Sequence, residues 1–295
     1  MIITNKNNLP SALVNLAQDR YEPKEKRYSA TTLLNPTRMI ILERRYFDKI
    51  VVDVSDLVWL IFGTAVHEIL ESHDKTGYAE IKFEQKVIND YTLVGKIDLY
   101  NKADYAIEDY KTASVWKVKF GDFDDWEKQG LIYAWLAMQE GFLVKKIRFH
   151  ALLKDWTARE LRLAKLKGDF YPENSIWTWE HNININEILE IENFINEKLN
   201  ELIIAEKLPD DKLPLCSPEE RWYSGDTFAV MKNGGKRALR VLDNMEDAEL
   251  YLKNKGGDYI SKRIGENRRC KDYCDVCQFC DFYKSLSNES EEEKE

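Results

Sequence analysis

Apolar and polar positions recur along the chain with two different periods, and together these periods predict a mixed α/β fold. Apolar residues spaced by three and four are typical of a helix that buries one face. Strict alternation is typical of a strand with one buried face. In chain order, the two periods predict a helix over 56–72, strands over 80–88, 91–100 and 106–112, a helix over 123–141 and a strand over 145–153.

Capping and turn residues extend this pattern on both sides. A capped helix start is expected over 28–34, a long amphipathic helix over 186–205, a hairpin through 233–235 and a helix near 247–254. We therefore expect four parts: a helical lead-in over 1–55, an α/β core over 56–160, a helical and hairpin extension with cysteines over 161–286, and a tail over 287–295. The tail is rich in glutamate, so we expect it to be disordered.

Charged residues gather where the strands over 91–100 and 106–112 are expected to form an antiparallel hairpin. Asp98 lies near the end of the first strand, and Asp109 and Lys111 lie in the second. Side chains alternate along a strand, so Asp109 and Lys111 share one face while Glu108 and Tyr110 share the other. Two carboxylates at one place raise a pKa or require a cation. The sequence therefore predicts a divalent metal site here.

Helices on either side of this hairpin carry further candidates. His67 lies in the helix before it, where a lone histidine is more often a packed or surface residue than a ligand. Gln129 and Tyr133 are four residues apart in the helix after it, so they present on one face. From the pattern alone, Tyr133 is as readily a core residue and Gln129 a surface amide.

Asp98, Asp109 and Lys111 give the D…D-x-K arrangement of the PD-(D/E)XK nucleases, which this chain resembles. His67 within Gly63-Thr64-Ala65-Val66-His67-Glu68, the Gln129 and Tyr133 pair, and the cysteines narrow the resemblance to the RecB/AddB-like, phage-type, iron–sulfur-containing exonuclease branch. It implies a restriction-endonuclease-like core of helix, three strands, helix and strand. It also implies a metal-dependent DNA nuclease, an exonuclease, in phage-related replication, recombination or repair.

The same resemblance implies roles for these residues. His67, Asp98, Asp109 and the main-chain carbonyl of Tyr110 would hold Mg²⁺ or Mn²⁺. Lys111 would position the attacking water or stabilise charge in the transition state. Gln129 and Tyr133 would orient the DNA strand or a group of the active site.

Five cysteines predict a second metal-binding region. Four follow one another as C-x3-C-x2-C-x2-C from Cys270 to Cys280, and Cys216 lies upstream. Without a secretory signal pattern, metal binding is favoured over disulfides. The resemblance implies a 4Fe–4S cluster held by Cys216, Cys270, Cys274 and Cys280, which leaves Cys277 spare. Cys277 in place of Cys216 is the alternative ligand, and zinc is the alternative metal.

Charge and composition restrict the possible partners. The 295 residues carry a formal charge of −9, which argues against a general basic coat for nucleic acids. We expect DNA binding to be weak and sensitive to salt without a helicase or recombinase partner. The sequence contains no phosphate-binding P-loop motif, so ATP-driven unwinding would need another polypeptide.

The N-terminus lacks a signal pattern and no apolar run approaches the roughly 20 residues that span a bilayer, so we expect a cytoplasmic protein without membrane contact. Two other functions stay open. One is a DNA-binding subunit of a recombination complex whose nuclease site is silent. The other is a binding module stabilised by zinc. Intact Asp98, Asp109 and Lys111 argue against the first, and a bound iron cluster would exclude the second.

Overall fold

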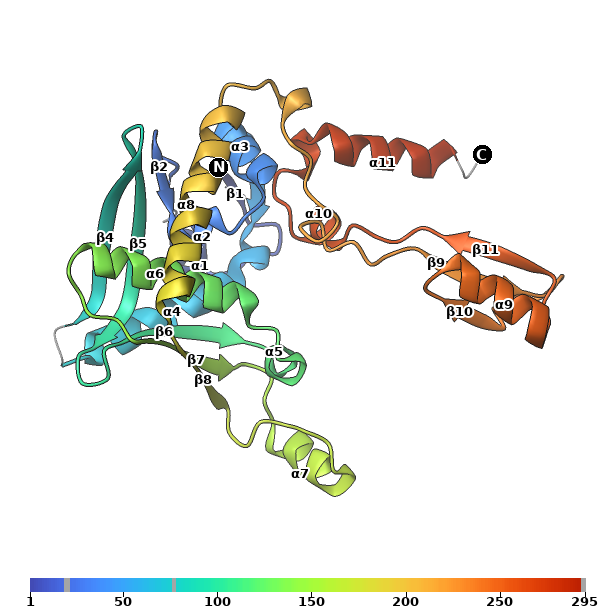
Figure 1. Cartoon of the computed structure of the whole chain (residues 1–295), viewed down its shortest axis with the longest axis horizontal. Coiled ribbons are helices and arrows are strands. Elements are labelled where there is room, and N and C mark those ends of the chain that lie inside the picture. The colour runs from blue at the N-terminus through green and yellow to red at the C-terminus, as the bar shows by residue number, and fades with distance from the viewer. Residues whose placement is uncertain (19–21, 76–77, 293–295) are drawn as a thin grey trace. The chain divides into compact units, whose positions relative to one another are not determined.

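The fold was obtained as a computed structural model that describes residues 1–18, 22–75 and 78–292. The chain divides into two compact units, Met1–Leu208 and Pro209–Glu295, each with its own sheet (Figure 1). The mixed α/β character expected from the sequence is confirmed. The division comes later than the expected boundary after residue 160. The reason is that β8 (Ile176–Asn182) pairs with β7 and that α8 (Ile185–Ala205) packs on helices of the first unit.

The central sheet of the first unit has strand order β2-β5-β6-β7-β8, with β4 also paired to β5. Its strands are β2 (Arg27–Ser29), β4 (Ala79–Ile88), β5 (Tyr91–Asn101), β6 (Ala106–Ala113), β7 (Lys146–Leu153) and β8. β4, β5 and β6 form an antiparallel meander, whereas β6 and β7 are parallel. The expected hairpin of β5 and β6 is confirmed, and β6 lies between two strands in the interior of the sheet.

Apolar helices bury one face of this sheet. α6 (Asp124–Gln139) contacts β4, β5, β6 and β7, and α8 packs on its outer side together with α3 (Thr37–Tyr46). α6 is therefore buried on nearly all sides, with Ile132 and Leu136 fully enclosed. Three acidic residues in its first turn suit the positive end of the helix dipole. This packing fixes Gln129 and Tyr133 against the sheet.

α4 (Val58–His73) carries His67 and follows the short 3-10 helix Val54–Leu57, close to the helix expected over 56–72. In chain order α4 precedes β4, β5 and β6, and α5 (Val115–Phe120) and α6 follow them before β7. The Asn89–Asp90 turn joins β4 to β5, and both residues have positive φ. Asparagine and aspartate tolerate that conformation, which two-residue hairpin turns require.

The residues before α4 contribute strands as well as the helices expected of a helical lead-in. β1 (Ile2–Thr4) pairs in parallel with β3 (Val51–Asp53), and α1 (Ser11–Gln18) lies between them in the chain. As expected, Ser29 caps a helix: its hydroxyl accepts a hydrogen bond from the Thr32 amide at the start of α2 (Ala30–Leu33). The segment after β7 forms α7 (Ala158–Lys167).

The second unit holds a three-stranded antiparallel sheet of order β10-β9-β11. Its elements are β9 (Thr227–Met231), β10 (Arg240–Leu242), α9 (Met245–Lys255), β11 (Tyr259–Arg263), α10 (Arg268–Asp272) and α11 (Asp281–Glu292). β9 and β10 form the hairpin expected around 233–235. α11 extends through Glu292, so residues 287–292 of the expected disordered tail are helical. Within the described residues, no helix combines the length and apolarity needed to cross a bilayer.

Candidate active site

β6 places a buried carboxylate next to an ammonium group. Asp109 is 4% exposed, and its Oδ2 lies 2.6 Å from Nζ of Lys111. The two side chains share the face of β6 that α6 covers, as alternation along a strand predicts. Lys111 Nζ also donates to Oε1 of Gln129 at 3.0 Å. The ammonium group is therefore held between a strand and a helix.

A second hydrogen bond joins Gln129 to Tyr133, which lies one turn further along α6. The Gln129 amide Nε2 donates to the Tyr133 hydroxyl at 3.0 Å, and both side chains are buried. Burial raises the pKa of Tyr133 above its ordinary value, so the hydroxyl stays protonated. The sequence predicted that these two residues present on one face. The structure adds that they form a chain of polar contacts from Tyr133 through Gln129 to Lys111.

Asp98 lies where the ladder between β5 and β6 ends. The paired residues run from Asn101 and Ala106 to Leu99 and Glu108. Beyond that point Asp98 Oδ2 accepts a hydrogen bond of 2.7 Å from the amide of Tyr110. Its other oxygen lies 3.1 Å from Nδ1 of His67, and this hydrogen bond raises the pKa of His67. α4 thus brings His67 to the hairpin, as expected.

Electrostatics at Asp109 indicate a carboxylate whose charge is incompletely balanced. Burial raises the pKa of Asp109 above its ordinary value, the Lys111 ammonium lowers it, and the nearby Asp98 carboxylate raises it again. The net direction is upward although a lysine lies in contact. A divalent cation would favour the ionised form of both carboxylates. The donors present, two carboxylates and an imidazole, suit Mg²⁺ or Mn²⁺, with the imidazole favouring manganese.

One acidic residue of this site was missed by the sequence analysis. Atoms of His67, Glu80 and Asp98 lie within 4.8 Å of one another, which is close enough for one ion. Asp109 lies outside this group and faces Lys111. The other acidic residue of β4, Glu84, is exposed and ion-paired with Arg27. The sequence shows Glu80 only as one of two acidic residues in a predicted strand. Nothing in that pattern distinguishes Glu80 from Glu84.

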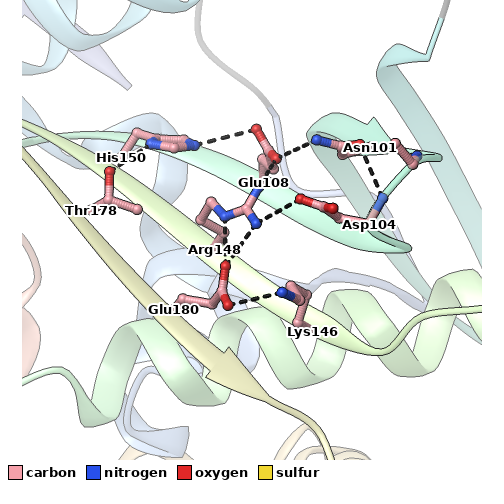
Figure 2. A network of polar contacts seen from close by, with 9 residues as sticks. Asn101, Asp104, Glu108, Lys146, Arg148, His150, Thr178 and Glu180 are labelled. Atoms are coloured by element: carbon pink, nitrogen blue, oxygen red, sulfur yellow. Dashed lines mark hydrogen bonds and ion pairs between the residues drawn. The ribbon is translucent and has the colours of Figure 1, made fainter.

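The opposite face of β6 carries a different set of charges. Glu108 contacts Arg148, His150 and Asn101, and Arg148 also contacts Asp104 and Glu180 (Figure 2). Burial raises the pKa of Glu108, but hydrogen bonds from His150 and Asn101 and the charge of Arg148 outweigh it and bring the pKa to about 2. Glu108 is therefore ionised and fully partnered.

Tyr110 lies on this second face as well. Its ring stacks on His150 at 5.7 Å between centroids and meets the edge of His67 at 6.4 Å. Its amide donates to Asp98. The predicted role of its carbonyl as a metal ligand stays a prediction.

The cysteines all lie in the second unit, where the segment around Cys216 meets the segment before Cys270. Arg221 joins them, because its Nη1 donates to the Cys216 carbonyl at 3.0 Å and its Nε donates to Asn267 at 2.9 Å. Burial raises the pKa of Cys274 to about 12, and the charges of Cys277, Cys270 and Cys216 add to the shift. Five thiols in one neighbourhood are a donor set that suits a thiolate-bound metal or cluster.

Comparison with known proteins gives distant structural neighbours only. No family model and no curated protein matches the sequence. A crystal structure of the protein SSO0001 is 17% identical and covers 64% of this chain and 83% of its own, with a TM-score of 0.46. An alkaline exonuclease from Laribacter hongkongensis is 12% identical and covers 61% and 89%, with a TM-score of 0.35. A phage-related exonuclease from Haemophilus somnus 129PT is 12% identical and covers 66% and 82%, with a TM-score of 0.28. All three TM-scores are below 0.5, so the function is argued from the site itself.

Proposed function

We propose that the chain is a metal-dependent nuclease of the PD-(D/E)XK type that hydrolyses phosphodiester bonds in DNA. The observation that carries the proposal is the placement of Lys111, whose ammonium contacts the buried carboxylate of Asp109 and the buried amide of Gln129. A structural ion pair would satisfy Asp109, yet the pKa of Asp109 stays raised. A site that keeps negative charge in excess beside a fixed cation is suited to binding a metal ion and a phosphate together.

Asp98, Asp109 and His67 would hold Mg²⁺ or Mn²⁺, with the Tyr110 carbonyl as a further expected ligand. When bound, the ion supplies charge stabilisation at the phosphate and lowers the pKa of a water. Lys111 stabilises the negative charge that develops on the phosphate. Gln129 fixes the direction of the Lys111 ammonium, and the Tyr133 hydroxyl fixes the Gln129 amide. The contacts among Lys111, Gln129 and Tyr133 are buried, which excludes bulk water and strengthens the interaction of Lys111 with an anion.

Cleavage of end-labelled single- and double-stranded DNA tests the proposal. The full chain, purified without oxygen, is assayed with Mg²⁺ or Mn²⁺ beside Lys111→Ala. We expect metal-dependent cutting that falls about 100-fold or more in the variant, as for loss of one preorganised charge. Lys86→Ala is the matched control, because Lys86 is an exposed lysine of β4 whose ion partner is Asp90. The product ladder would also show the polarity of cutting.

Two outcomes would contradict this function. Equal cutting by Lys111→Ala and the parent would remove Lys111 from the mechanism. A parent protein that binds Mn²⁺ and DNA without cutting would favour the second function, a silent DNA-binding subunit that works with a helicase or recombinase.

We further propose that Cys216, Cys270, Cys274 and Cys280 hold a 4Fe–4S cluster with a structural role. Among the described residues, neither group of three candidate ligand atoms within 4.8 Å includes a cysteine sulfur. A tetrahedral zinc with bonds of about 2.3 Å would bring its sulfurs to roughly 4 Å from one another. The contacts of Arg221 with both segments support a cluster that includes Cys216.

Iron and sulfide analysis of the anaerobic protein tests the cluster. We expect both elements in the parent and in Cys277→Ser, and their loss in Cys216→Ser. Loss in Cys277→Ser with retention in Cys216→Ser would move the fourth ligand to Cys277. Zinc without iron would instead support the zinc-stabilised module.

A further inference from the structure

Glu80 lies at the beginning of β4 in a conformation that its neighbours do not share. Its φ is +56°, whereas the rest of β4 continues as an ordinary strand. Residues with a Cβ rarely adopt this left-handed region, and such strain concentrates at functional sites. Glutamate has no short polar side chain that would relieve it locally. The chain thus carries a glutamate at a position whose backbone conformation would suit glycine.

The register of the sheet places this carboxylate against a second one. Ala79 pairs with Leu99 and Ile81 pairs with Ile97, so Glu80 lies opposite Asp98. Like charges directly opposite each other in an antiparallel pair are destabilising. The Glu80 side chain is only 12% exposed, so water screens this repulsion weakly.

A small pocket lies between these groups. It measures about 10 Å³ and is lined by His67, Glu80, Asp98 and Tyr110, among others. That volume is about the space that one water-sized occupant needs. Candidate ligand atoms of His67, Glu80 and Asp98 lie within 4.8 Å of one another. Three ligands of mixed oxygen and nitrogen type around a pocket of this size suit a single small divalent cation.

From this geometry we infer that Glu80 is a direct ligand of the divalent cation, together with His67 and Asp98. The inference rests on the proposed nuclease function and adds a residue to its metal site. Glu80 adds a third anionic donor to Asp98 and Asp109, the two carboxylates already proposed as ligands. The contact that competes with this role is the ion pair of Glu80 with Lys96, whose side chain is 49% exposed.

Titration of Mn²⁺ into the full chain, followed by calorimetry, tests the inference without using catalysis. We expect Glu80→Gln to raise the dissociation constant for Mn²⁺ by roughly 10- to 100-fold, because affinity follows the number of charged ligands. Glu84→Gln is the matched control, since Glu84 lies on the same strand and its partner is Arg27. It should bind Mn²⁺ as the parent does.

Two further variants separate a ligand from a structural ion pair. Lys96→Met removes the competing ammonium, so Mn²⁺ binding should be unchanged or tighter. Glu80→Gly relieves the positive φ, so the metal-free protein should melt higher while Mn²⁺ binding weakens. A raised melting temperature would show that the Glu80→Gly protein is folded. Its weakened Mn²⁺ binding would then report the loss of a ligand.

The outcomes distinguish this inference from the function on which it rests. Parental affinity for Mn²⁺ in Glu80→Gln, with equal loss of melting temperature in Glu80→Gln and Lys96→Met, would reduce Glu80 to an ion-pair residue and overturn the inference alone. A parent protein that binds no Mn²⁺ would overturn the proposed function as well. A larger Mn²⁺-induced rise in melting temperature for the parent than for Glu80→Gln would support the inference independently of the calorimetry.

Discussion

The two faces of β6 carry adjacent carboxylates that are both buried but differ in their partners and in the direction of their pKa shifts. Glu108 is 6% exposed and Asp109 is 4% exposed. Glu108 is surrounded by Arg148, His150 and Asn101, and its pKa falls to about 2. Asp109 has Lys111 on one side and the charge of Asp98 on the other, and its pKa rises. Burial penalises both charges, and the partners outweigh this penalty at Glu108 but not at Asp109.

This difference separates a structural charge from a functional one. Around Glu108 every polar partner belongs to the sheet, as Figure 2 shows, and the network links β6, β7 and β8. Around Asp109 the cation in contact is Lys111, and the charge of Asp98 opposes its effect on the pKa of Asp109. The first arrangement is complete without a ligand, whereas under the proposed function a bound metal ion would complete the second.

The largest expected effect is on DNA cleavage by the two isosteric variants. Asp109→Asn should lower the rate about 1000-fold or more, because it removes a ligand of the metal. Glu108→Gln should stay within a few-fold of the parent, because its side chain lies on the face of β6 opposite Asp109 and Lys111. Steady-state cleavage with saturating Mn²⁺ measures both. Comparable losses in the two variants would break the distinction between the faces.

The second effect is on the free energy of unfolding, and here Glu108→Gln should be the more damaging of the two variants. Glu108→Gln should lower the free energy of unfolding by about 2–3 kcal/mol, because Arg148 and His150 lose a buried anionic partner. Asp109→Asn should leave the metal-free protein as stable as the parent or more so, since the charge it removes is disfavoured. Urea unfolding followed by circular dichroism measures both changes. A metal-free Asp109→Asn less stable than Glu108→Gln would contradict the account.

The dependence of stability on pH sharpens the comparison further. The pKa of Glu108 is lowered in the folded state, so its contribution is present above the ordinary pKa of 4.5 and is lost as pH falls toward about 2. The difference in melting temperature between the parent and Glu108→Gln should therefore shrink between these two values. Calorimetric melting from pH 2 to pH 7 measures it. A difference that stays constant over this range would remove the assigned role of Glu108.

Much of this site could be predicted from the sequence, because it depends on the spacing of residues within single strands and helices. Alternation along β6 places Asp109 with Lys111 and Glu108 with Tyr110, whatever the rest of the fold. Helical spacing brings Gln129 and Tyr133 to one face. The hydrogen bond between Gln129 and Lys111 is not local, because it depends on how α6 packs on the sheet.

What the sequence does not reveal depends on register and backbone conformation. Glu80 lies opposite Asp98 only because β4 and β5 pair in one particular register, and its positive φ has no counterpart in residue type. The partners of Glu108 come from β5 and β7, up to 42 positions away at His150. The first unit extends to Leu208 because β8 and α8 pack with the core, which periodicity alone does not show.

The smallest expected effect is at the end of the polar chain on the α6 side. Tyr133→Phe removes the hydroxyl that fixes Gln129, so the cleavage rate should fall about 10-fold while the free energy of unfolding changes by less than about 1 kcal/mol. Mn²⁺ affinity should be unchanged, since neither residue is a ligand. A variant that loses Mn²⁺ binding would show that Tyr133 shapes the metal site itself.

The most direct test of the contrast between the two faces is a titration of Mn²⁺ into the parent, Asp109→Asn and Glu108→Gln, monitored by calorimetry. The account predicts that the binding heat disappears in Asp109→Asn and that Glu108→Gln keeps the parental affinity despite its lower stability. Retention of the heat in Asp109→Asn, or its loss in Glu108→Gln at a temperature where that variant is folded, would contradict the assignment of Asp109, and not Glu108, to the metal site.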